Sequence, residues 1–438
     1  MTAGLLPSGQ LLRLRPETDM VAFGDGPPLS HAAFRRQVSG LAQTLRGCDV
    51  ATLACRDSAA FAIGLVALLR AGTRVLLPPN GLPATLATLP GGPGRLVDDA
   101  AVWAAAPSDQ PPPAPPADAA VTFFTSGSSG APKCISRRLV ELEREAALLE
   151  GLWGGVLGGA PVLALVGHQH LYGLTFKILW PLAAGRPFDR RTPAVWESLL
   201  QDLPDQAALV VSPAHLGRMG GLSALPAARS PAAVFTAGAP LAAADARQAA
   251  ALLGAPPIEI FGSTETGAVA TRRQTLGDED WTLLPGHRLL QSDDGRLRLY
   301  SPYSQAEVET ADRIEPRPGG FRFLGRADRI AKVAGKRVAL TEVEQALAAL
   351  PWLAEAAALQ LDDGALAAVA VPSPAGAERL AALGAFRFSR LLRRDLAGRL
   401  DTAALPKRWR FPDALPFHPL GKNIGAALAA LFTEEKAR

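Results

Sequence analysis

The segment TFFTSGSSGAPK, residues 122–133, brings together groups that bind phosphate. A short run of strand-forming residues, 120–124, leads into a stretch of hydroxyl side chains and glycines that ends at Lys133. Glycine lets a backbone approach a ligand closely, N–H and hydroxyl groups donate hydrogen bonds to phosphate oxygens, and an ammonium adds positive charge. A Gly/Ser loop can also be a flexible linker, but the Pro132-Lys133 pair is not typical of one. The spacing differs from a Walker loop, so the segment predicts a polyphosphate site of another kind.

Four downstream segments add groups that could bind or transform a nucleotide. They are IEIFGSTETGAV (258–269), ETADR (309–313), GGFRFLGRADRIAKVAGKRVALTEVEQAL (319–347) and LPFHPLGKNI (415–424). The first offers the flat ring of Phe261, the hydroxyl of Thr264 and the carboxylate of Glu265. The others supply charged side chains, namely Asp312, Arg326, Asp328, Lys332 and Lys422.

The five motifs, taken in this order, resemble those of the superfamily of adenylate-forming enzymes, which comprises acyl- and aryl-CoA synthetases, peptide-synthetase adenylation domains and luciferases. Each motif alone is moderately specific, but five in the family's order are very specific, and together they cover nearly the whole chain. The resemblance implies that a carboxylate attacks the α-phosphate of ATP, forming an acyl-adenylate and pyrophosphate, and that a thiol then displaces AMP. Because the first step brings two anions together, it needs cations and hydrogen-bond donors around the phosphorus.

The resemblance also assigns roles around the triphosphate and the nucleoside. The first motif would hold the β- and γ-phosphates through Thr125, Ser126, Gly127, Ser128, Ser129, Gly130 and Lys133. Thr264 would bond the α-phosphate, and Glu265 would ligate the Mg²⁺ that neutralises the triphosphate. The nucleoside would contact Gly238, Ala239, Pro240, Phe261, Gly262, Asp312 and Arg326. In that set Phe261 would stack on adenine, with a plain core position as its alternative, and Asp312 would accept both ribose hydroxyls.

The C-terminal motifs imply two half-reactions served by one mobile domain. Lys422 would reach the carboxylate and the bridging ribose oxygen during adenylation. Asp328 matches the family's hinge, where a change of backbone torsion swings the small domain. After the swing, Lys422 would leave and the hairpin that carries Lys332 and Gly335 would enter, with the glycine letting a pantetheine arm pass close to the backbone.

The HQHLYG turn matches the part of the family that gates the acyl site. His170 is the candidate for the gating position, and His168 competes with it. Peptide-synthetase domains place an aspartate two or three residues later to bind an α-ammonium, whereas Tyr172 and Gly173 stand here and the next aspartate is Asp189. The resemblance therefore disfavours an α-amino acid and favours an acyl or small aromatic acid.

These observations predict an ATP-dependent, AMP-forming acid–thiol ligase whose acceptor is CoA or the phosphopantetheine of a carrier protein. One alternative is a stand-alone adenylation domain dedicated to loading a carrier protein. An alternative of a different class is a non-catalytic family member that binds a nucleotide or a partner, but the retention of Lys133, Glu265 and Lys422 argues against it.

The elements that must position these residues follow the βαβ rhythm of a doubly wound α/β fold. Apolar residues at helical spacing indicate a helix over 29–46, and an apolar run over 58–72 indicates a buried helix. Buried strands are expected over 50–55 and 73–79, next to these helices. Further short strands are predicted over 161–167, 208–212, 233–238 and 258–262.

The C-terminal third changes character. Short alternating runs broken by Pro-Gly, Asp-Asp-Gly and Gly-Gly predict a small β-barrel or meander over 281–325. A hairpin-like segment follows, and Thr341 with Glu344 forms the pattern of a capping box at the start of a helix. We therefore expect a large N-terminal α/β domain, residues 1–327, and a small mobile α+β domain, residues 328–438.

The composition of the chain limits the classes of protein to which it can belong. At 438 residues, 48% apolar and 20% charged, the chain is long enough for two to three domains with an ample core. Its net charge is +4, and basic residues occur in short clusters without interleaved aromatics, so nucleic-acid binding is not expected. Three cysteines and the lack of a secretory or membrane-spanning pattern predict a cytoplasmic protein. Abundant Ala, Gly, Pro, Leu and Arg indicates a bacterial source, and the sequence leaves monomer and homodimer open.

Overall fold

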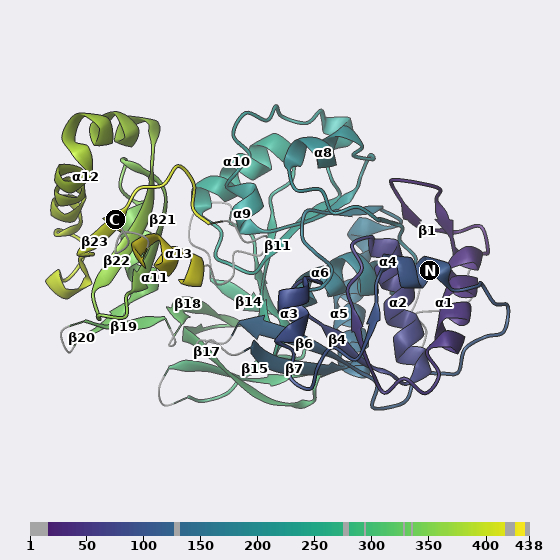
Figure 1. Ribbon diagram of the computed structural model, residues 1–438. Helices are drawn as coiled ribbons and strands as arrows, with labels where there is room; N and C mark the ends of the chain where they lie inside the picture. Colours follow the sequence, from purple (N-terminus) through teal and green to yellow (C-terminus); the bar gives the residue numbers. More distant parts are fainter. Residues whose placement is uncertain are drawn as a thin grey trace. The chain divides into compact units, whose positions relative to one another are not determined.

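The computed structural model describes residues 16–126, 132–274, 280–292, 295–326, 329–333, 336–416 and 425–433. Within it the chain divides into two compact units, and Figure 1 follows the chain through both. The first contains Met1–Arg288 and Leu299–Val308, and the second contains Leu289–Arg298 and Glu309–Arg438. The boundary predicted near residue 327 stays a prediction, because Ala327 and Asp328 lie outside the described residues.

A five-stranded sheet in the first unit carries the phosphate motif. Its strand order is β5-β3-β4-β6-β7, in which the first four strands run parallel and β7 pairs antiparallel with β6. The strands are β3 (Val50–Leu53), β4 (Arg74–Leu77), β5 (Arg95–Val97), β6 (Ala120–Ser126) and β7 (Pro132–Arg138). The helices are α1 (His31–Thr44), α2 (Ser58–Ala71), α3 (Pro83–Ala87) and α4 (Asp99–Ala104). This alternation confirms the predicted doubly wound arrangement.

Helix α2 carries apolar residues around its whole circumference, which is typical of a helix buried on all sides. Residues 58–69 are all buried. Asp57 caps the helix by accepting a hydrogen bond from the N–H of Ala59 at 2.7 Å, and Gly72 ends it with a left-handed φ of 75°. The end residues therefore set the length of the helix, and the apolar run sets its burial.

A second sheet in the first unit brings the predicted nucleotide turns to one end of its strands. These strands are part of a 13-stranded sheet and follow one another in the order β14-β13-β12-β11-β10-β8-β9-β1-β2. The strands are β1 (Met20–Phe23), β2 (Leu29–Ser30), β8 (Val162–Ala164), β9 (Phe188–Asp189), β10 (Ala208–Val211), β11 (Ala233–Ala237), β12 (Ile258–Ser263), β13 (Gly267–Arg272) and β14 (Trp281–Leu283). Strands β8, β10, β11 and β12 are parallel neighbours, whereas β13 is antiparallel to β12. Because the carboxyl ends of parallel strands share one end of a sheet, the segments after β8, β11 and β12 lie there together.

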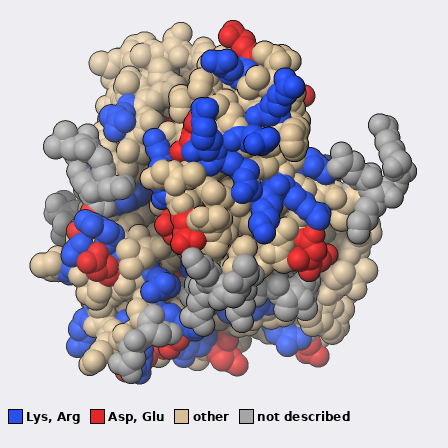
Figure 2. All heavy atoms as spheres, turned by 90° about the vertical axis from the view of Figure 1, so that its left-hand side faces the viewer, with Lys and Arg blue, Asp and Glu red and all other residues tan. Residues whose placement is uncertain are grey.

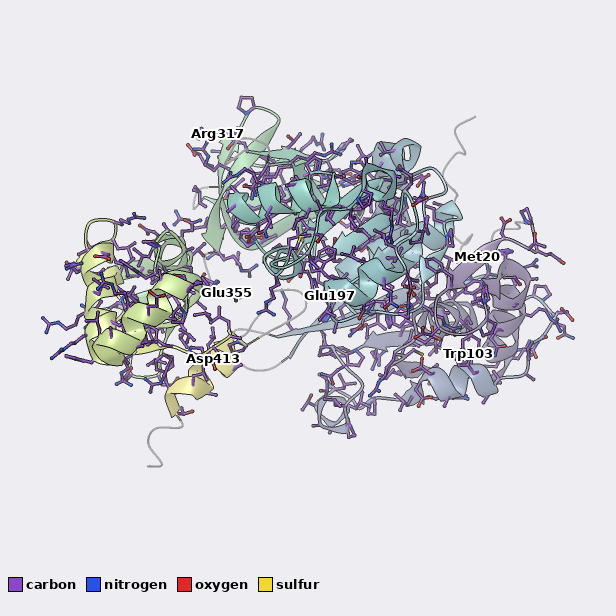
Figure 3. All side chains as sticks on the ribbon, turned by 90° about the horizontal axis from the view of Figure 1, so that it is seen from above. Met20, Trp103, Glu197, Arg317, Glu355 and Asp413 are labelled. Atoms are coloured by element: carbon purple, nitrogen blue, oxygen red, sulfur yellow. The ribbon has the colours of Figure 1, made fainter. Side chains whose placement is uncertain are left out.

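Helices cover this second sheet. They are α5 (Leu139–Leu157), α6 (Leu171–Gly173), the π-helix η1 (Leu174–Leu179), α7 (Trp180–Ala184), α8 (Trp196–Gln201), α9 (Pro213–Leu216), the 3-10 helix η2 (Ala227–Arg229) and α10 (Ala243–Leu253). Apolar residues of α8, α9 and α10 pack with those of β8, β10 and β11 in one buried cluster. On the outer surface, Figure 3 labels Met20, Trp103 and Glu197, all of them exposed.

The second unit combines most of a β-meander with an α+β part. Strands β15 (Arg288–Leu289), β16 (Arg296–Ser301), β17 (Ala306–Arg317) and β18 (Gly320–Arg326) are consecutive neighbours, which is the meander form of the sequence prediction. The α+β part contains β19 (Ile330–Val333), β20 (Lys336–Ala339), α11 (Leu340–Ala348), β21 (Leu353–Gln360), β22 (Leu366–Pro372), α12 (Pro374–Leu396), η3 (Thr402–Ala404), β23 (Arg408–Arg410) and α13 (Gly425–Thr433). Strands β19 and β20 form the predicted hairpin.

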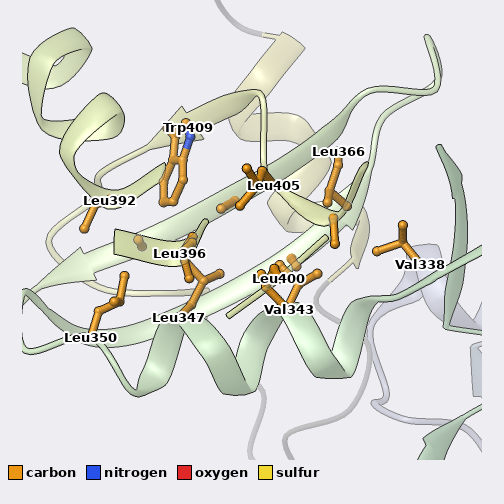
Figure 4. Packing of buried hydrophobic residues seen from close by; sticks show 14 of the residues in the cluster. Val338, Val343, Leu347, Leu350, Leu366, Leu392, Leu396, Leu400, Leu405 and Trp409 are labelled. Atoms are coloured by element: carbon orange, nitrogen blue, oxygen red, sulfur yellow. The ribbon is translucent and has the colours of Figure 1, made fainter. Parts of the chain in front are cut away.

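The core of the second unit lies between α11, α12 and the sheet β21-β22-β23. Val343 and Leu347 of α11 and Leu396 of α12 are fully buried in it, as Figure 4 shows. The capping box predicted here is wrong, because α11 begins at Leu340, ahead of Thr341. Glu344 instead accepts hydrogen bonds from Arg329, at 2.7 and 2.9 Å, and thereby ties the helix to the segment just before β19.

None of the helices in the described ranges combines the length and the apolar character that crossing a bilayer requires. Figure 2 shows one face of the molecule, where Lys and Arg side chains gather in a broad patch.

Candidate active site

The hairpin β6–β7 places Lys133 opposite Thr125. The strands pair from Ala120↔Arg138 to Ser126↔Pro132, so the connecting loop begins directly after Ser126. Residues 121–124 are β-branched or aromatic, which favours this strand. The rest of the predicted phosphate loop, Gly127, Ser128, Ser129 and Gly130, lies outside the described residues.

The ammonium of Lys133 contacts the carboxylate of Glu265, which comes 132 residues later in the chain. The Nζ–Oε1 distance is 2.7 Å, and the side chains are 60% and 35% exposed. Burial alone raises the pKa of Glu265, but hydrogen bonds from Lys133 and the backbone outweigh it and hold the pKa below its ordinary value. Glu265 is therefore ionised at neutral pH, as a metal-binding carboxylate must be.

Two glycines and two hydroxyls shape the turn between β12 and β13. The N–H of Ser263 donates to Thr266 Oγ1 at 2.9 Å, and the N–H of Thr266 donates to Ser263 Oγ at 3.3 Å. Glycine is required at Gly262, where a Cβ would lie 2.1 Å from the carbonyl oxygen of Gly267. Gly267 itself has a φ of +70°, which L side chains rarely adopt. The turn that carries Thr264 and Glu265 is therefore tightly closed.

Phe261 lies beside a second aromatic ring at the end of β12. Its half-buried ring meets that of Trp281 nearly edge-on, with centroids 5.3 Å apart. The guanidinium of Arg272 lies 4.6 Å from the Trp281 ring centroid and is held by Glu259 at 3.0 Å. Phe261 is thus not a fully buried core residue, and its stacking on adenine stays a prediction.

The turn after β11 lies beside the turn after β12. Strand β11 pairs in parallel with β12, with Ala237 opposite Ile260. Gly238 follows directly and has a φ of +101°, so glycine suits this position. Gly238, Ala239 and Pro240 thus reach the same end of the sheet as Phe261, as a shared nucleotide site requires.

His168 is a structural residue. Its ring is buried, with Nδ1 2.9 Å from Ser58 Oγ and Nε2 2.9 Å from the carbonyl oxygen of Cys55. Since a carbonyl only accepts, Nε2 carries the proton and Nδ1 accepts from the serine. Burial, with the nearby Lys177 charge, lowers the pKa of His168 to about 3, so the ring stays neutral. His170 is half-buried at the N-terminus of α6 and stays the candidate for the acyl site.

An aromatic wall follows His170, and the sequence analysis did not predict it. We use this name for Tyr172, Phe176 and Trp180 together with Phe235 of β11. Centroid distances are 4.9 Å from Tyr172 to Phe176, 5.3 Å from Phe176 to Phe235 and 5.6 Å from Trp180 to Phe235. The i, i+4, i+8 spacing of the first three is a helical signal that could have found them.

A buried lysine anchors the π-helix η1 that carries this wall. Lys177 is fully buried, and its Nζ donates to the carbonyl of Arg191 at 2.6 Å and to Thr192 Oγ1 at 2.7 Å. Burial lowers the pKa of Lys177 to about 7, although the charge of Asp189 acts in the opposite direction. A π-helix places its residues differently from an α-helix, so this anchor helps to decide where Phe176 lies.

In the second unit the structure brings Asp312 and Arg326 together. They are opposite one another on β17 and β18, and Arg326 Nη1 lies 3.5 Å from Asp312 Oδ1. Asp312 is buried, and its Oδ2 accepts a hydrogen bond from Thr310 Oγ1 at 2.9 Å. These contacts fix the orientation of the Asp312 carboxylate.

The predicted catalytic residues of the C-terminal region are only partly described. Lys332 lies on β19, opposite Arg337 of β20. Asp328, Gly335 and Lys422 lie outside the described residues, so their roles stay predictions.

Comparison with known proteins identifies the family. Residues 85–290 match the sequence profile of a family described as AMP-binding enzyme. A 4-coumarate–CoA ligase of Rhodobacter capsulatus is 34% identical over 309 residues, which are 69% of this chain and 74% of that protein. The chain belongs to the AMP-binding enzyme family. An L-proline–L-prolyl-carrier-protein ligase of Pseudomonas fluorescens is also similar, at 31% identity over 24% of this chain and 27% of that protein.

Solved structures show the same fold for this AMP-binding enzyme. ATP-bound MatB from Rhodopseudomonas palustris has a TM-score of 0.78 at 19% identity, with 98% of each chain covered. A benzoate CoA ligase from Burkholderia xenovorans has a TM-score of 0.73 at 17% identity, covering 94% of this chain and 97% of that one.

The family assignment confirms the predicted class of activity. The chain is an AMP-forming ligase that uses ATP to activate a carboxylic acid as an acyl-adenylate and then transfers the acyl group to a thiol.

Proposed function

We propose that this AMP-binding enzyme joins an aromatic carboxylic acid to CoA. The observation that carries this choice is Tyr172, which follows His170 and is the half-buried ring of the aromatic wall, whereas Phe176, Trp180 and Phe235 are buried behind it. Aromatic rings bury large flat areas and pair edge to face with other rings. A flat acid therefore suits the half-buried ring of Tyr172 better than a polar or flexible one. The similarity to a 4-coumarate–CoA ligase supports the same choice.

An α-amino acid is a poor candidate because the first aspartate after the HQHLYG turn is not available to bind its ammonium group. Asp189, the first aspartate after the HQHLYG turn, is 1% exposed. It accepts hydrogen bonds from Arg191, through its backbone N–H at 2.9 Å and through its guanidinium Nη2 at 2.9 Å. Asp189 is therefore committed to a structural ion pair.

The residues around Glu265 fit a Mg²⁺ ion that arrives with ATP. Within the described ranges, no three His, Cys, Asp or Glu residues form a cluster able to hold a metal. Mg²⁺ commonly binds through one or two carboxylates, with phosphate and water as its other ligands. Glu265 supplies one ionised, partly exposed carboxylate, and a bound Mg²⁺ would neutralise charge on the triphosphate.

Side chains of the protein would bind and orient the substrates. Lys133 would leave Glu265 for the terminal phosphates, Thr264 would donate to the α-phosphate, and Asp312 would hold the ribose. Lys422 would orient the carboxylate during adenylation. Movement about Asp328 would then exchange Lys422 for the hairpin that carries Lys332.

A panel of acids, with pyrophosphate release as the readout, tests the proposed substrate class. We expect hydroxycinnamic and benzoic acids to support release with ATP and Mg²⁺, and CoA to convert their adenylates to thioesters. We expect α-amino acids and short aliphatic acids to give rates at least about tenfold lower, because they have no flat ring to pack against Tyr172. Faster release with an α-amino acid than with every aromatic acid would contradict the proposal.

An arginine face on α12 favours a carrier protein as the alternative acceptor. The helix buries Phe388, Leu392 and Leu396, and at 100° per residue the opposite side carries three exposed arginines, Arg387, Arg390 and Arg394. Residues 374–410 contain nine Lys or Arg and three Asp or Glu, a net charge of +6, against +4 for the whole chain. An acidic carrier protein would complement such a face.

Charge reversal on α12 separates the two acceptors. In the triple variant Arg387→Glu, Arg390→Glu and Arg394→Glu, we expect thioester formation with CoA to stay near the wild-type rate. If a carrier protein docks there, loading of holo-carrier should fall by about tenfold or more, because like charges would face each other. The control reverses three exposed arginines of the first unit, Arg46, Arg74 and Arg247. Equal loading by the two triple variants would exclude this face as the docking site.

A further inference from the structure

A buried charge cluster lies under the turn between β12 and β13, and none of the assigned roles uses it. It consists of Arg137 at the end of β7 and of Glu141 and Glu145 on the first turns of α5. These residues are four apart in sequence, so Glu141 and Glu145 share one side of the helix. They are only 3%, 8% and 2% exposed, and Arg137 Nε donates to Glu141 Oε2 at 3.0 Å. Charged residues are rarely buried this far unless they are paired or have a specific role.

The cluster holds the backbone of the turn on both sides of Glu265. Arg137 Nη1 donates to the carbonyl of Thr264 at 3.1 Å. Past the turn, Glu145 Oε1 accepts from the N–H of Ala268 at 2.9 Å. The hydroxyl of Tyr303 donates to the carbonyl of the same alanine at 2.8 Å. The turn is therefore bracketed by side chains from β7, α5 and the 299–308 segment.

The charge cluster packs closely against the backbone of the turn. A Cβ on Gly267 would lie 2.7 Å from Glu145 Oε2, so the backbone is already in close contact with the carboxylate. Burial raises the pKa of Glu145, and the charge of Arg137 opposes that rise. Arg137 thus stabilises the carboxylate that bonds to Ala268 and also bonds to Thr264 directly.

Strand β7 reaches the turn at two points. Lys133 and Arg137 are four residues apart on one strand and therefore lie on the same face. Lys133 contacts the side chain of Glu265, and Arg137 contacts the backbone carbonyl one residue earlier. The hairpin that carries the phosphate loop and the turn that carries the predicted metal ligand are thus linked as one body.

We propose that Arg137 is a positioning residue for adenylate formation. The proposal rests on the function proposed above. Arg137 sets Thr264 and Glu265 at a fixed place relative to the phosphate hairpin before ATP binds, so that binding requires no rearrangement of the turn. The expected signature is a defect confined to Mg·ATP and to the adenylation half-reaction, because Arg137 acts through the turn that carries Thr264 and Glu265.

The test compares Arg137→Met with Arg138→Met. Arg138 is the matched control because it also pairs with Glu141, at 2.9 Å, but its side chain is 52% exposed and lies on the opposite face of β7. For Arg137→Met, we expect the dissociation constant for Mg·ATP, measured by calorimetry without acid, to rise about tenfold. The rate of acid-dependent pyrophosphate exchange should fall by on the order of 10²-fold, which is the effect of misplacing reacting groups by about 1 Å. Arg138→Met should match the wild type in both.

Three further measurements separate positioning from a structural role. Thioester formation from preformed adenylate should stay within about threefold of wild type in Arg137→Met. Arg137→Lys, which keeps the charge, should recover part of the exchange rate. If Arg137→Met does not fold, Tyr303→Phe offers a second test, because it removes a hydroxyl that also bonds to the backbone next to the turn. This variant, too, should bind Mg·ATP more weakly than the wild type.

Equal loss of both half-reactions in a folded Arg137→Met protein would overturn the proposal. So would an unchanged Mg·ATP affinity in either Arg137→Met or Tyr303→Phe. A wild-type protein that shows no acid-dependent exchange with any acid would instead overturn the proposed function, so the two failures are distinguishable.

Discussion

Replacing Lys422 by alanine is expected to slow adenylate formation by on the order of 10²–10³, the typical cost of removing one group that stabilises charge in a transition state. The step joins an anionic carboxylate to an anionic phosphate, and Lys422 is the cation that the resemblance places between them. The measurement is acid-dependent pyrophosphate exchange, with wild type and variant at saturating Mg·ATP. Both proteins are expected to unfold at the same temperature, so that the change in rate reports on the reaction step alone.

The same variant should still make thioester from a synthetic acyl-adenylate and a thiol at a near-normal rate. Lys332→Ala is the matched counterpart, since Lys332 lies on the β19–β20 hairpin, past the predicted hinge. It should keep adenylation and show a slower transfer to the thiol. If Lys422→Ala impairs transfer from preformed adenylate as badly as adenylation, then the division of labour between the two lysines is wrong.

The second large effect is expected for Glu265→Gln, which removes a negative charge while keeping the shape of the side chain. The rate of adenylation at limiting Mg²⁺ should fall by on the order of 10²-fold, and higher Mg²⁺ should restore part of it. Folding should persist, because the turn is closed by Ser263, Thr266 and two glycines rather than by Glu265. The lost pair with Lys133 is partly exposed and is worth only about 0–1 kcal/mol of stability.

Glu197→Gln is the control for this change. Glu197 is an exposed carboxylate on α8 (Figure 3), with the same isosteric substitution and the same change of net charge. It should leave the Mg²⁺ dependence untouched. Wild-type adenylation by Glu265→Gln at limiting Mg²⁺ would remove Glu265 from the metal site.

Local features of the fold could be predicted because they depend on neighbouring residues. The buried helix α2 follows from an uninterrupted apolar run between Asp57 and Gly72, and the strands β3, β4, β8, β10, β11 and β12 follow from short buried runs. The capping box at Thr341 does not form, because α11 begins at Leu340 and the carboxylate of Glu344 is engaged by Arg329, which lies between β18 and β19. A short polar pattern cannot reveal that competition.

In the candidate site, too, some features could be predicted from the sequence and others depended on the tertiary structure. Order and residue type were enough to indicate a phosphate loop, a Thr-Glu turn and the family, since each motif is contiguous in sequence. His168 and His170 could not be separated in this way, because both have the same chemistry. The choice depended on Ser58 and Cys55, which lie more than 100 residues earlier and satisfy both ring nitrogens of His168.

The sequence by itself determined the class of chemistry and the segments that perform it. The reason is that the glycines, hydroxyls and charges of each binding loop are neighbours in sequence and can be recognised without the fold. Only the tertiary structure decided how these segments meet. The contact of Lys133 with Glu265 and that of Arg137 with Thr264 join residues 132 and 127 positions apart. The aromatic wall likewise needs Phe235 of β11 to reach Phe176 of η1. Such contacts are set by the order of strands in a sheet and by the packing of helices on it, and these depend on the whole chain rather than on any local pattern.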